Sequence, residues 1–152
     1  DLNELINSAI HKNSPTNDHI IVFHQNENLP LFRLDTGLME QVMHNLIHNA
    51  IQYTPENTII EIDVKHQSNV CIITVSDNGK GFPENEILKA FDKFYRSPNT
   101  KRGGIGLGLS IVKGFVEAHN GKVRLENNKK CGAKFIIEIP AETSFLNNLK
   151  NE

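Results

Sequence analysis

The sequence has few of the residues that mark specialised classes of protein. It holds two cysteines and no tryptophan in 152 residues, which excludes a small scaffold stapled by disulfides. Cys71 and Cys131 lie far apart, each in an apolar, strand-like context, so the paired short spacing of a zinc site is missing as well. We expect a reduced, cytoplasmic setting.

Long apolar runs and a strong net charge are also missing. No stretch approaches the ~18 apolar residues of a membrane span, and the chain opens at Asp1 with neither a methionine nor a signal-peptide pattern. A formal net charge of -2 gives no global attraction for nucleic acid or an anionic membrane. We therefore expect neither as a partner of this chain, which we interpret as a fragment of a longer protein.

Helical and extended periodicities alternate clearly along the chain. Apolar spacing predicts helices over 2–9, 36–54 and 107–119, with Asp35 as N-cap of the second, and a brief helix over 84–90. Alternation predicts strands over 19–24, 60–65, 71–75, 122–126 and 134–140, with a shorter extended piece over 31–34. The strands pair mainly as hairpins and the helices can all cover one face, so we predict an α+β fold, a two-layer sandwich.

The chain divides into three parts on this interpretation. Residues 1–14 hold the first helix, residues 15–141 form one globular domain, and residues 142–152 form a loosely attached helix or tail. Within the domain, residues 91–103 have no sustained periodicity, so we predict a mobile loop there.

The segment KRGGIGLGLSIVKGF, residues 101–115, places four glycines within six residues just before a helix. Backbone N–H groups of such a turn can approach phosphate oxygens, and the helix N-terminus adds a partial positive charge. A dinucleotide-binding loop would follow a first strand, and a Walker lysine is absent. A helix that merely starts with flexible glycines is the alternative, although clustering four glycines is costly in chain entropy.

A second glycine segment, DNGKG, places Asp77 at a strand end beside Gly79 and Gly81. The carboxylate can accept a hydrogen bond from an exocyclic amine, and the glycines would let a ligand come close. An ordinary surface turn is the alternative.

Asn45 and Asn49 stand four residues apart within the long helix, so their amides share a face. Asparagine has little reason to recur inside a helix unless its amide solvates a buried group or an ion, and an amide oxygen suits Mg²⁺. Two exposed asparagines are the alternative. His44 and His48 have the same spacing, but no third ligand accompanies them, and we interpret them as surface residues.

Four ordered motifs resemble a known family. They are an N box, NLIHNAIQYTP, a first G box, DNGKGFP, an F box, FDKFYR, and a second G box, GGIGLGLSIVKGF. In this order they resemble the catalytic ATP-binding domain of sensor histidine kinases, whose superfamily also holds DNA gyrase B, MutL-type repair proteins and a heat-shock chaperone. The resemblance covers essentially the whole chain and implies the Bergerat (GHKL) fold. Segments before the N box and around the second G box are most similar to the potassium-responsive Kdp-type sensor kinases.

The resemblance implies a site for ATP and Mg²⁺. Asn49 would coordinate Mg²⁺ with Asn45 beside it, Tyr53 would pack near the adenine, and Asp77 would accept from its N6 amine. The other implied ligand-binding residues are Gly79 and Gly81 around the base, Phe94, Tyr95 and Arg96 in the F box, and Gly104, Gly106, Leu107 and Gly108 around the phosphates. Asn45, Asn49 and Arg96 would take part in phosphoryl transfer, with Arg96 reaching a phosphate. The loop over 91–103 would be the ATP lid.

Two departures from the family pattern concern ligand binding. Gln52 stands where many relatives carry Lys or Arg that neutralises phosphate charge. Phosphate binding would therefore be weaker, or Lys93, Lys101 or Arg102 would substitute. Ala133 stands where a Thr or Ser hydroxyl often supports the adenine-binding Asp. A water could fill that role.

A third departure concerns the reaction. Asn45 stands where hydrolytic relatives carry a Glu as general base, and an amide cannot take a proton from water. Intrinsic ATP hydrolysis is therefore disfavoured. Kinase chemistry stays consistent, because a neutral imidazole is itself the nucleophile.

The function implied by the resemblance is transfer of the γ-phosphoryl of ATP to a histidine on a separate domain. In the family this acceptor lies in a preceding dimerisation hairpin and is followed by an acidic residue. None of the histidines here has that context: His11, His19, His24, His44, His48, His66 and His119. We therefore expect a fragment that binds ATP without autophosphorylating, with residues 1–14 following the hairpin.

The resemblance also implies a setting for the parent protein. It would be a homodimer, anchored in the inner membrane, with a response regulator as partner. The alternatives are an anti-sigma-type serine kinase, a gyrase-like ATPase, which Asn45 disfavours, and a degenerate nucleotide-binding module.

Overall fold

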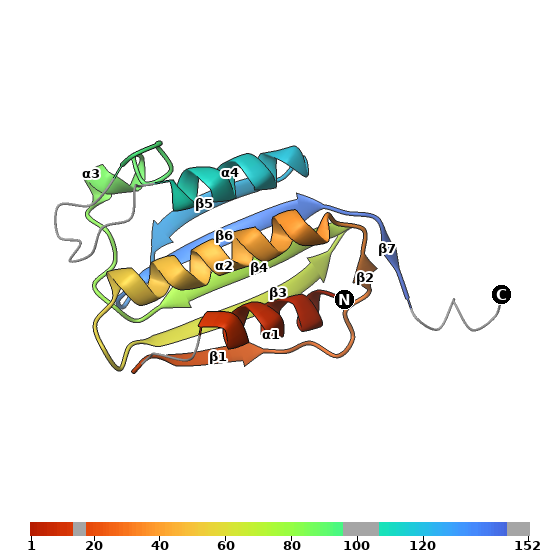
Figure 1. Cartoon of the computed structure of the whole chain (residues 1–152), viewed down its shortest axis with the longest axis horizontal. Coiled ribbons are helices and arrows are strands. Elements are labelled where there is room, and N and C mark those ends of the chain that lie inside the picture. Colours follow the sequence, from red (N-terminus) through yellow and green to blue (C-terminus); the bar gives the residue numbers. More distant parts are fainter. Residues whose placement is uncertain (14–17, 96–106, 146–152) are drawn as a thin grey trace.

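The computed structural model describes residues 1–13, 18–95 and 107–145, and its helices lie on one face of a five-stranded sheet (Figure 1). The elements are α1 (Leu2–Asn13), β1 (Ile20–His24), β2 (Leu31–Phe32), α2 (Thr36–Tyr53), β3 (Ile59–Gln67), β4 (Val70–Asp77), α3 (Glu84–Ile87), α4 (Gly108–Ala118), β5 (Lys122–Asn127), β6 (Ala133–Pro140) and β7 (Thr143–Ser144). The predicted α+β sandwich is confirmed.

The sheet has the strand order β1-β3-β4-β6-β5, in which β1 runs parallel to β3 and the other neighbours are antiparallel. The two predicted hairpins, β3–β4 and β5–β6, are present. Ser68 and Asn69 close the first with φ values of 52° and 61°, as a two-residue loop with both residues left-handed requires.

One continuous core fills the space between the helices and the sheet. Alternate residues of β3, Ile60, Ile62 and Val64, point toward the helices and are at most 1% exposed. From the other layer α2 contributes Leu46 and Ile47, both 0% exposed. The buried residues of α1 belong to the same core, and α1 lies beside α2 (Figure 1).

Local side-chain chemistry fixes the ends of the long helices. Asp35 caps α2 as predicted, because its Oδ1 accepts from the Leu38 N–H at 2.9 Å. After α4, Asn120 takes the left-handed conformation with φ 58°. Gly121 lets the chain pack closely on β6, because a Cβ there would lie 2.6 Å from the carbonyl oxygen of Glu138.

The segment after β6 is more ordered than the sequence indicated. Thr143 and Ser144, expected within a loosely attached tail, form β7 and pair antiparallel with β2. The pair makes a separate two-stranded sheet. No local sequence pattern predicts this pairing, because the two strands lie more than a hundred positions apart and each spans only two residues.

The two cysteines are free, with Cys71 buried and Cys131 exposed. Burial raises the pKa of the Cys71 thiol to about 12, so this side chain behaves as a small core residue. Among the described residues, no helix combines the length and hydropathy that crossing a membrane requires.

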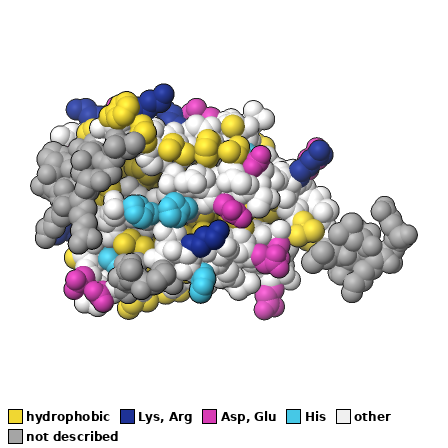
Figure 2. Space-filling model, in the orientation of Figure 1, with side chains coloured by type: hydrophobic (Ala, Val, Ile, Leu, Met, Phe, Trp, Pro, Cys, Tyr) yellow, Lys and Arg dark blue, Asp and Glu magenta, His cyan; other side chains and the backbone are white. Residues whose placement is uncertain are grey.

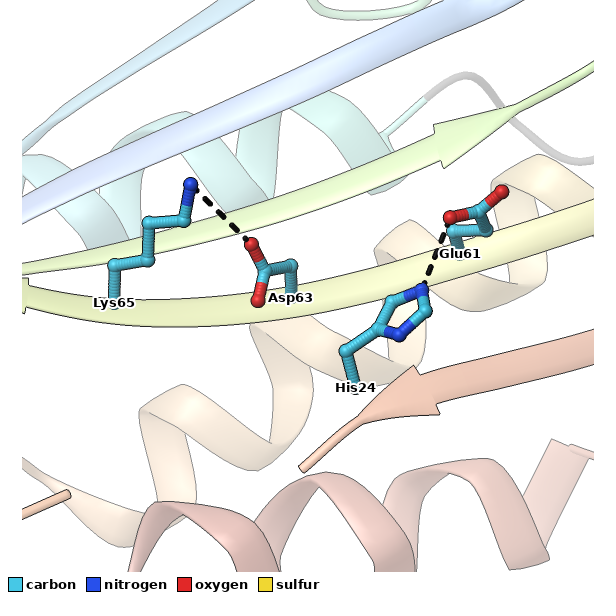
Figure 3. Close-up of polar contacts among 4 residues, drawn as sticks. All are labelled: His24, Glu61, Asp63 and Lys65. Carbon is cyan, nitrogen blue, oxygen red and sulfur yellow. Dashed lines mark hydrogen bonds and ion pairs between the residues drawn. The ribbon is translucent and has the colours of Figure 1, made fainter. Parts of the chain in front are cut away.

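The outer face of the sheet is polar. His24 of β1 pairs with Glu61 of β3, with Nε2 and Oε2 3.0 Å apart, and within β3 Lys65 Nζ lies 3.7 Å from Asp63 Oδ2. Figure 3 shows both pairs. Exposed pairs of this kind contribute little to stability.

Removing a core side chain gives a direct test of this packing. Leu46→Ala should lower the free energy of unfolding by roughly 2–5 kcal/mol, because Leu46 is 0% exposed and leaves a cavity. Leu88→Ala is the matched control, since Leu88 is 87% exposed, and should change the value by less than about 0.5 kcal/mol. Urea titration measures both, and equal losses would contradict the assigned core.

Candidate functional site

The site residues predicted from the motifs come from elements that lie together at one end of the helix layer. This end, at the left of Figure 1, holds the C-terminal half of α2, the end of β4, α3 and the start of α4. Asn45, Asn49 and Tyr53 come from α2, and Asp77 is the last residue of β4. The loop between β5 and β6 approaches the same place, through contacts with Asp77.

Asp77 is held by backbone donors. Its Oδ1 accepts from the Gly79 N–H at 2.9 Å and from the Ala133 N–H at 3.3 Å. Burial raises the pKa of this carboxyl, and the two backbone hydrogen bonds act in the opposite direction by stabilising the carboxylate. Since the described residues occupy Oδ1, the other oxygen can accept from a ligand.

The contact from Ala133 explains one departure from the family pattern. A side-chain hydroxyl was expected to be missing there, with water as a substitute. The backbone N–H of Ala133 itself reaches Asp77, so this position supplies one donor to the carboxylate even without a hydroxyl.

Glycine is required at Gly132 by close backbone packing. Gly132 has φ +88°, and a Cβ there would overlap the carbonyl oxygen of Asp77. Gly79 is crowded from the other side, because a Cβ would lie 2.9 Å from Thr54 Cγ2 and 3.0 Å from Asp77 Oδ1. Gly81 has φ +75°. These glycines let the loop after β4 fold tightly against α2 and β6.

Asn127 and Asn128, which belong to none of the four sequence motifs, hold the same loop. Asn127 makes a reciprocal pair with Phe82: its Oδ1 accepts from the Phe82 N–H at 2.9 Å and its Nδ2 donates to the Phe82 carbonyl at 2.7 Å. Asn128 Nδ2 donates to the Asp77 carbonyl at 3.2 Å. In the sequence, two adjacent asparagines at the end of a strand indicate polar contacts. The neighbouring residues do not indicate which remote groups the amides contact.

Aromatic rings form an apolar wall near Asp77. The ring centroids of Tyr53 and Phe82 are 5.7 Å apart, and Phe135 contacts Phe82 edge-on at 6.3 Å and Phe91 at 6.1 Å. A flat heterocycle packs well against such a surface. The fixed carboxylate beside it supplies a directional acceptor.

The asparagines of α2 present unpartnered polar atoms. Asn45 Oδ1 accepts from Gln41 Nε2 at 3.3 Å, but Asn45 Nδ2 and Asn49 Oδ1 are buried without a partner among the described residues. Neither residue is exposed, which removes the alternative of two surface asparagines. Buried polar atoms are rarely left unpaired, so this donor and acceptor point to a ligand.

His44 and His48 lie on the exposed side of α2, and Figure 2 shows histidine side chains on this face. Their rings stack with centroids 5.7 Å apart, and burial followed by the charge of His44 lowers the pKa of His48. Gln52 Nε2 lies 3.4 Å from His48 Nε2. The Gln52 amide is uncharged, so it cannot supply the positive charge that relatives carry at this position. The described residues contain no group of three or more potential metal-binding side chains of His, Cys, Asp and Glu.

The F box is only partly described. Phe94 has φ 64° and a side chain 68% exposed, so it does not pack on the aromatic wall. Burial and the nearby Glu86 carboxylate raise the pKa of Tyr95, and Lys93 is exposed. Arg96, Lys101, Arg102, Gly104 and Gly106 lie outside the described residues.

The last two predicted ligand residues begin α4. The Leu107 carbonyl accepts from the Ile111 N–H at 2.9 Å and from Ser110 Oγ at 2.8 Å. Gly108 is exposed, with nothing within 4 Å of a Cβ built on it. The first turn of α4 is thus formed as the glycine-rich motif predicted.

Residues 34–143 match the family described as histidine kinase-, DNA gyrase B-, and HSP90-like ATPase. The chain belongs to this family. The matched range includes every site residue discussed above, and the four motifs that resembled the family fall within it.

Similar proteins of this ATPase family are sensor kinases. The sensor protein KdpD of Clostridium acetobutylicum is 34% identical over 143 residues, covering 91% of this chain and 16% of the relative. The sensor protein kinase WalK of Staphylococcus epidermidis is 35% identical over 148 residues, covering 93% and 24%. The solved catalytic domain of histidine kinase ThkA is 31% identical with a TM-score of 0.80, covering 91% of each chain. ThkA has also been solved in complex with the response regulator protein TrrA, at 32% identity, TM-score 0.75 and coverage of 93% and 41%.

These similarities identify the chain as the ATPase domain of the sensor histidine kinase class. It spans about a quarter or less of the two curated relatives. KdpD agrees with the Kdp-type resemblance, and WalK is similar to the same degree.

A methyl group at Gly132 should disturb the site and the fold together. Gly132→Ala should lower the free energy of unfolding by about 2 kcal/mol or more, through the left-handed backbone and the overlap with Asp77. Gly114→Ala is the matched control in the exposed part of α4, where a Cβ meets nothing within 4 Å, and should stabilise by up to about 1 kcal/mol. Thermal unfolding measures both, and a harmless Gly132→Ala would refute the close approach.

Proposed function

We propose that this domain binds ATP together with Mg²⁺ and transfers the γ-phosphoryl group to a histidine on a separate domain. The observation that carries the proposal is the buried, unpartnered pair of Asn45 Nδ2 and Asn49 Oδ1 on α2. Membership of the family by itself implies ATP binding. The two unpartnered atoms support a position for the phosphates and the metal within this chain.

The adenine would bind at Asp77. The free carboxylate oxygen would accept from the N6 amine, while the ring packs near Tyr53 and Phe82. Gly79 and Gly81 would line the base pocket through their backbone, because the space of a Cβ is already filled at each, by Thr54 and by Asn127. Supporting this assignment, the carboxylate is already fixed by two backbone donors, so little ordering is needed on binding.

The phosphates and the metal would bind along α2 toward α4. Asn49 Oδ1 is a hard oxygen acceptor suited to Mg²⁺ or its water, and Asn45 Nδ2 is a donor suited to a phosphate oxygen. When bound, the ion neutralises phosphate charge. Arg96, Gly104, Gly106, Leu107 and Gly108 are proposed phosphate contacts, and of these Leu107 and Gly108 lie at the start of α4.

The residue set fits phosphoryl transfer better than hydrolysis. Asn45 cannot act as a general base toward water, and its Oδ1 already accepts from Gln41. An acceptor imidazole needs no such base, so positioning and charge stabilisation would suffice. We therefore expect no phosphorylation of this chain when it is incubated alone with ATP.

The partners follow from the same proposal. A dimerisation hairpin with the acceptor histidine would precede α1 in a homodimeric parent, and a response regulator would receive the phosphoryl group. ThkA, solved with TrrA, offers a precedent for a regulator as partner. A cytoplasmic position and a membrane anchor in the parent remain predictions from the family resemblance.

Two other functions remain less favoured. An anti-sigma-type serine kinase would share the fold, and a degenerate module would share it without activity. The similar proteins are sensor kinases, and the binding groups of Asn49 and Asp77 are intact, which favours the histidine kinase assignment over both.

Calorimetric titration with the non-hydrolysable analogue AMP-PNP tests the proposal. Wild type should bind saturably and more tightly with Mg²⁺, and Asn49→Ala should lose that Mg²⁺ dependence because the buried oxygen acceptor is gone. Asn7→Ala, at an exposed position of α1, is the matched control and should behave as wild type. Unchanged Mg²⁺ dependence in Asn49→Ala would show that another group holds the ion.

Asp77→Asn should separate stability from binding. Burial raises the pKa of Asp77 above its ordinary value of 3.8, so the folded protein holds this proton more tightly than the unfolded chain does. Ionisation therefore destabilises the fold as pH rises through 3.8 to the raised value, and the penalty persists at neutral pH.

The variant carries no such charge and should be at least as stable as wild type at pH 7, with its relative advantage shrinking near pH 3. Its affinity for AMP-PNP should nonetheless fall by about tenfold or more, the loss expected for one charged hydrogen bond. Unfolding curves at both pH values and calorimetry at pH 7 measure these effects. A variant that binds as wild type does would exclude Asp77 as the adenine acceptor.

A further inference from the structure

His19 lies outside every motif of the sequence, yet it contacts the end of the N box. Its Nε2 is 2.9 Å from Thr54 Oγ1 and 3.2 Å from the Thr54 carbonyl oxygen. His19 directly precedes β1, and Thr54 directly follows the last residue of α2. The same two segments are also joined by backbone hydrogen bonds, from the Asn57 N–H to the Asp18 carbonyl at 2.8 Å and from the Ile20 N–H to the Thr58 carbonyl at 3.1 Å.

The hydrogen bonds of Thr54 fix the tautomer of His19. Thr54 Oγ1 donates its only proton to the Ala50 carbonyl at 2.6 Å, so it must accept from His19. His19 accordingly carries its proton on Nε2. In the neutral ring Nδ1 then holds the lone pair, and this atom is buried without a partner among the described residues.

Thr54 in turn lies against the loop that holds Asp77. A Cβ built on Gly79 would lie 2.9 Å from Thr54 Cγ2, so this methyl group borders Gly79, and the Gly79 N–H donates to Asp77 Oδ1 at 2.9 Å. Rotation of Thr54 about χ1 would take the methyl group away from this place and change the surface that Gly79 packs against. With donor and acceptor both engaged, the hydroxyl holds Thr54 in one rotamer.

We infer that His19 is a positioning residue for adenine recognition: through Thr54 and Gly79 it sets the place of the Asp77 carboxylate. The inference rests on the proposed function, since it assigns His19 to the base end of that site. His19 itself touches no part of the proposed ligand. Its loss should therefore impair discrimination at the base and leave the metal dependence of binding intact.

The test compares selectivity for the base in three variants. His19→Leu removes the donor, while His19→Gln keeps a side-chain N–H at a similar reach. His24→Leu is the matched control on the same segment, because His24 faces Glu61 on the outer side of the sheet (Figure 3). The probes are AMP-PNP and its inosine counterpart, in which a carbonyl replaces the N6 amine, titrated calorimetrically with Mg²⁺ well below the unfolding temperature.

Wild type should prefer AMP-PNP, and His19→Leu should lower that preference about tenfold, the equivalent of one hydrogen bond to a charged group. His19→Gln should regain most of the preference, and His24→Leu should keep all of it. Unchanged preference in His19→Leu would overturn the inference, as would an equal loss in His24→Leu or no recovery in His19→Gln. If wild type binds no AMP-PNP, the proposed function itself fails; saturable wild-type binding with a neutral His19→Leu removes only the role of His19.

Discussion

The close approach of the start of β6 to the end of β4 is the constraint on which the site depends. Only glycine fits at position 132, since a Cβ there would overlap the Asp77 carbonyl oxygen. This approach brings the Ala133 N–H to Asp77 Oδ1, while the Gly79 N–H reaches the same oxygen from the loop after β4. The carboxylate is thus fixed by backbone groups, whose positions follow from the sheet.

The two ends of the site differ in how complete they are. At the proposed base end, Asp77 has its donors and the aromatic rings already contact one another. At the proposed phosphate end, Asn45 Nδ2 and Asn49 Oδ1 are buried and lack partners among the described residues. A ligand would meet a prepared acceptor for its base and would itself supply the missing partners on α2, which favours a molecule that spans both ends.

Features set by neighbouring residues could be predicted from the sequence. The Asp35 cap, the β3–β4 hairpin and the shared face of Asn45 and Asn49 all depend on positions a few residues apart. Features set by distant pairing could not: β1 lies parallel beside β3 and β7 pairs with β2 without any local signal. The same limit applies to the site, where Asn127, His19 and the backbone of Ala133 act through contacts with remote residues.

Amide NMR of the isotope-labelled domain, titrated with AMP-PNP and Mg²⁺, tests most directly where the nucleotide binds. The account predicts that the largest shift changes occur at the backbone amides of Gly79 and Gly81 and at the side-chain amides of Asn45 and Asn49. Residues of the outer sheet face, such as Glu61 and Lys65, should change little. Large changes on that outer face, with the α2 amides unmoved, would contradict the proposed site.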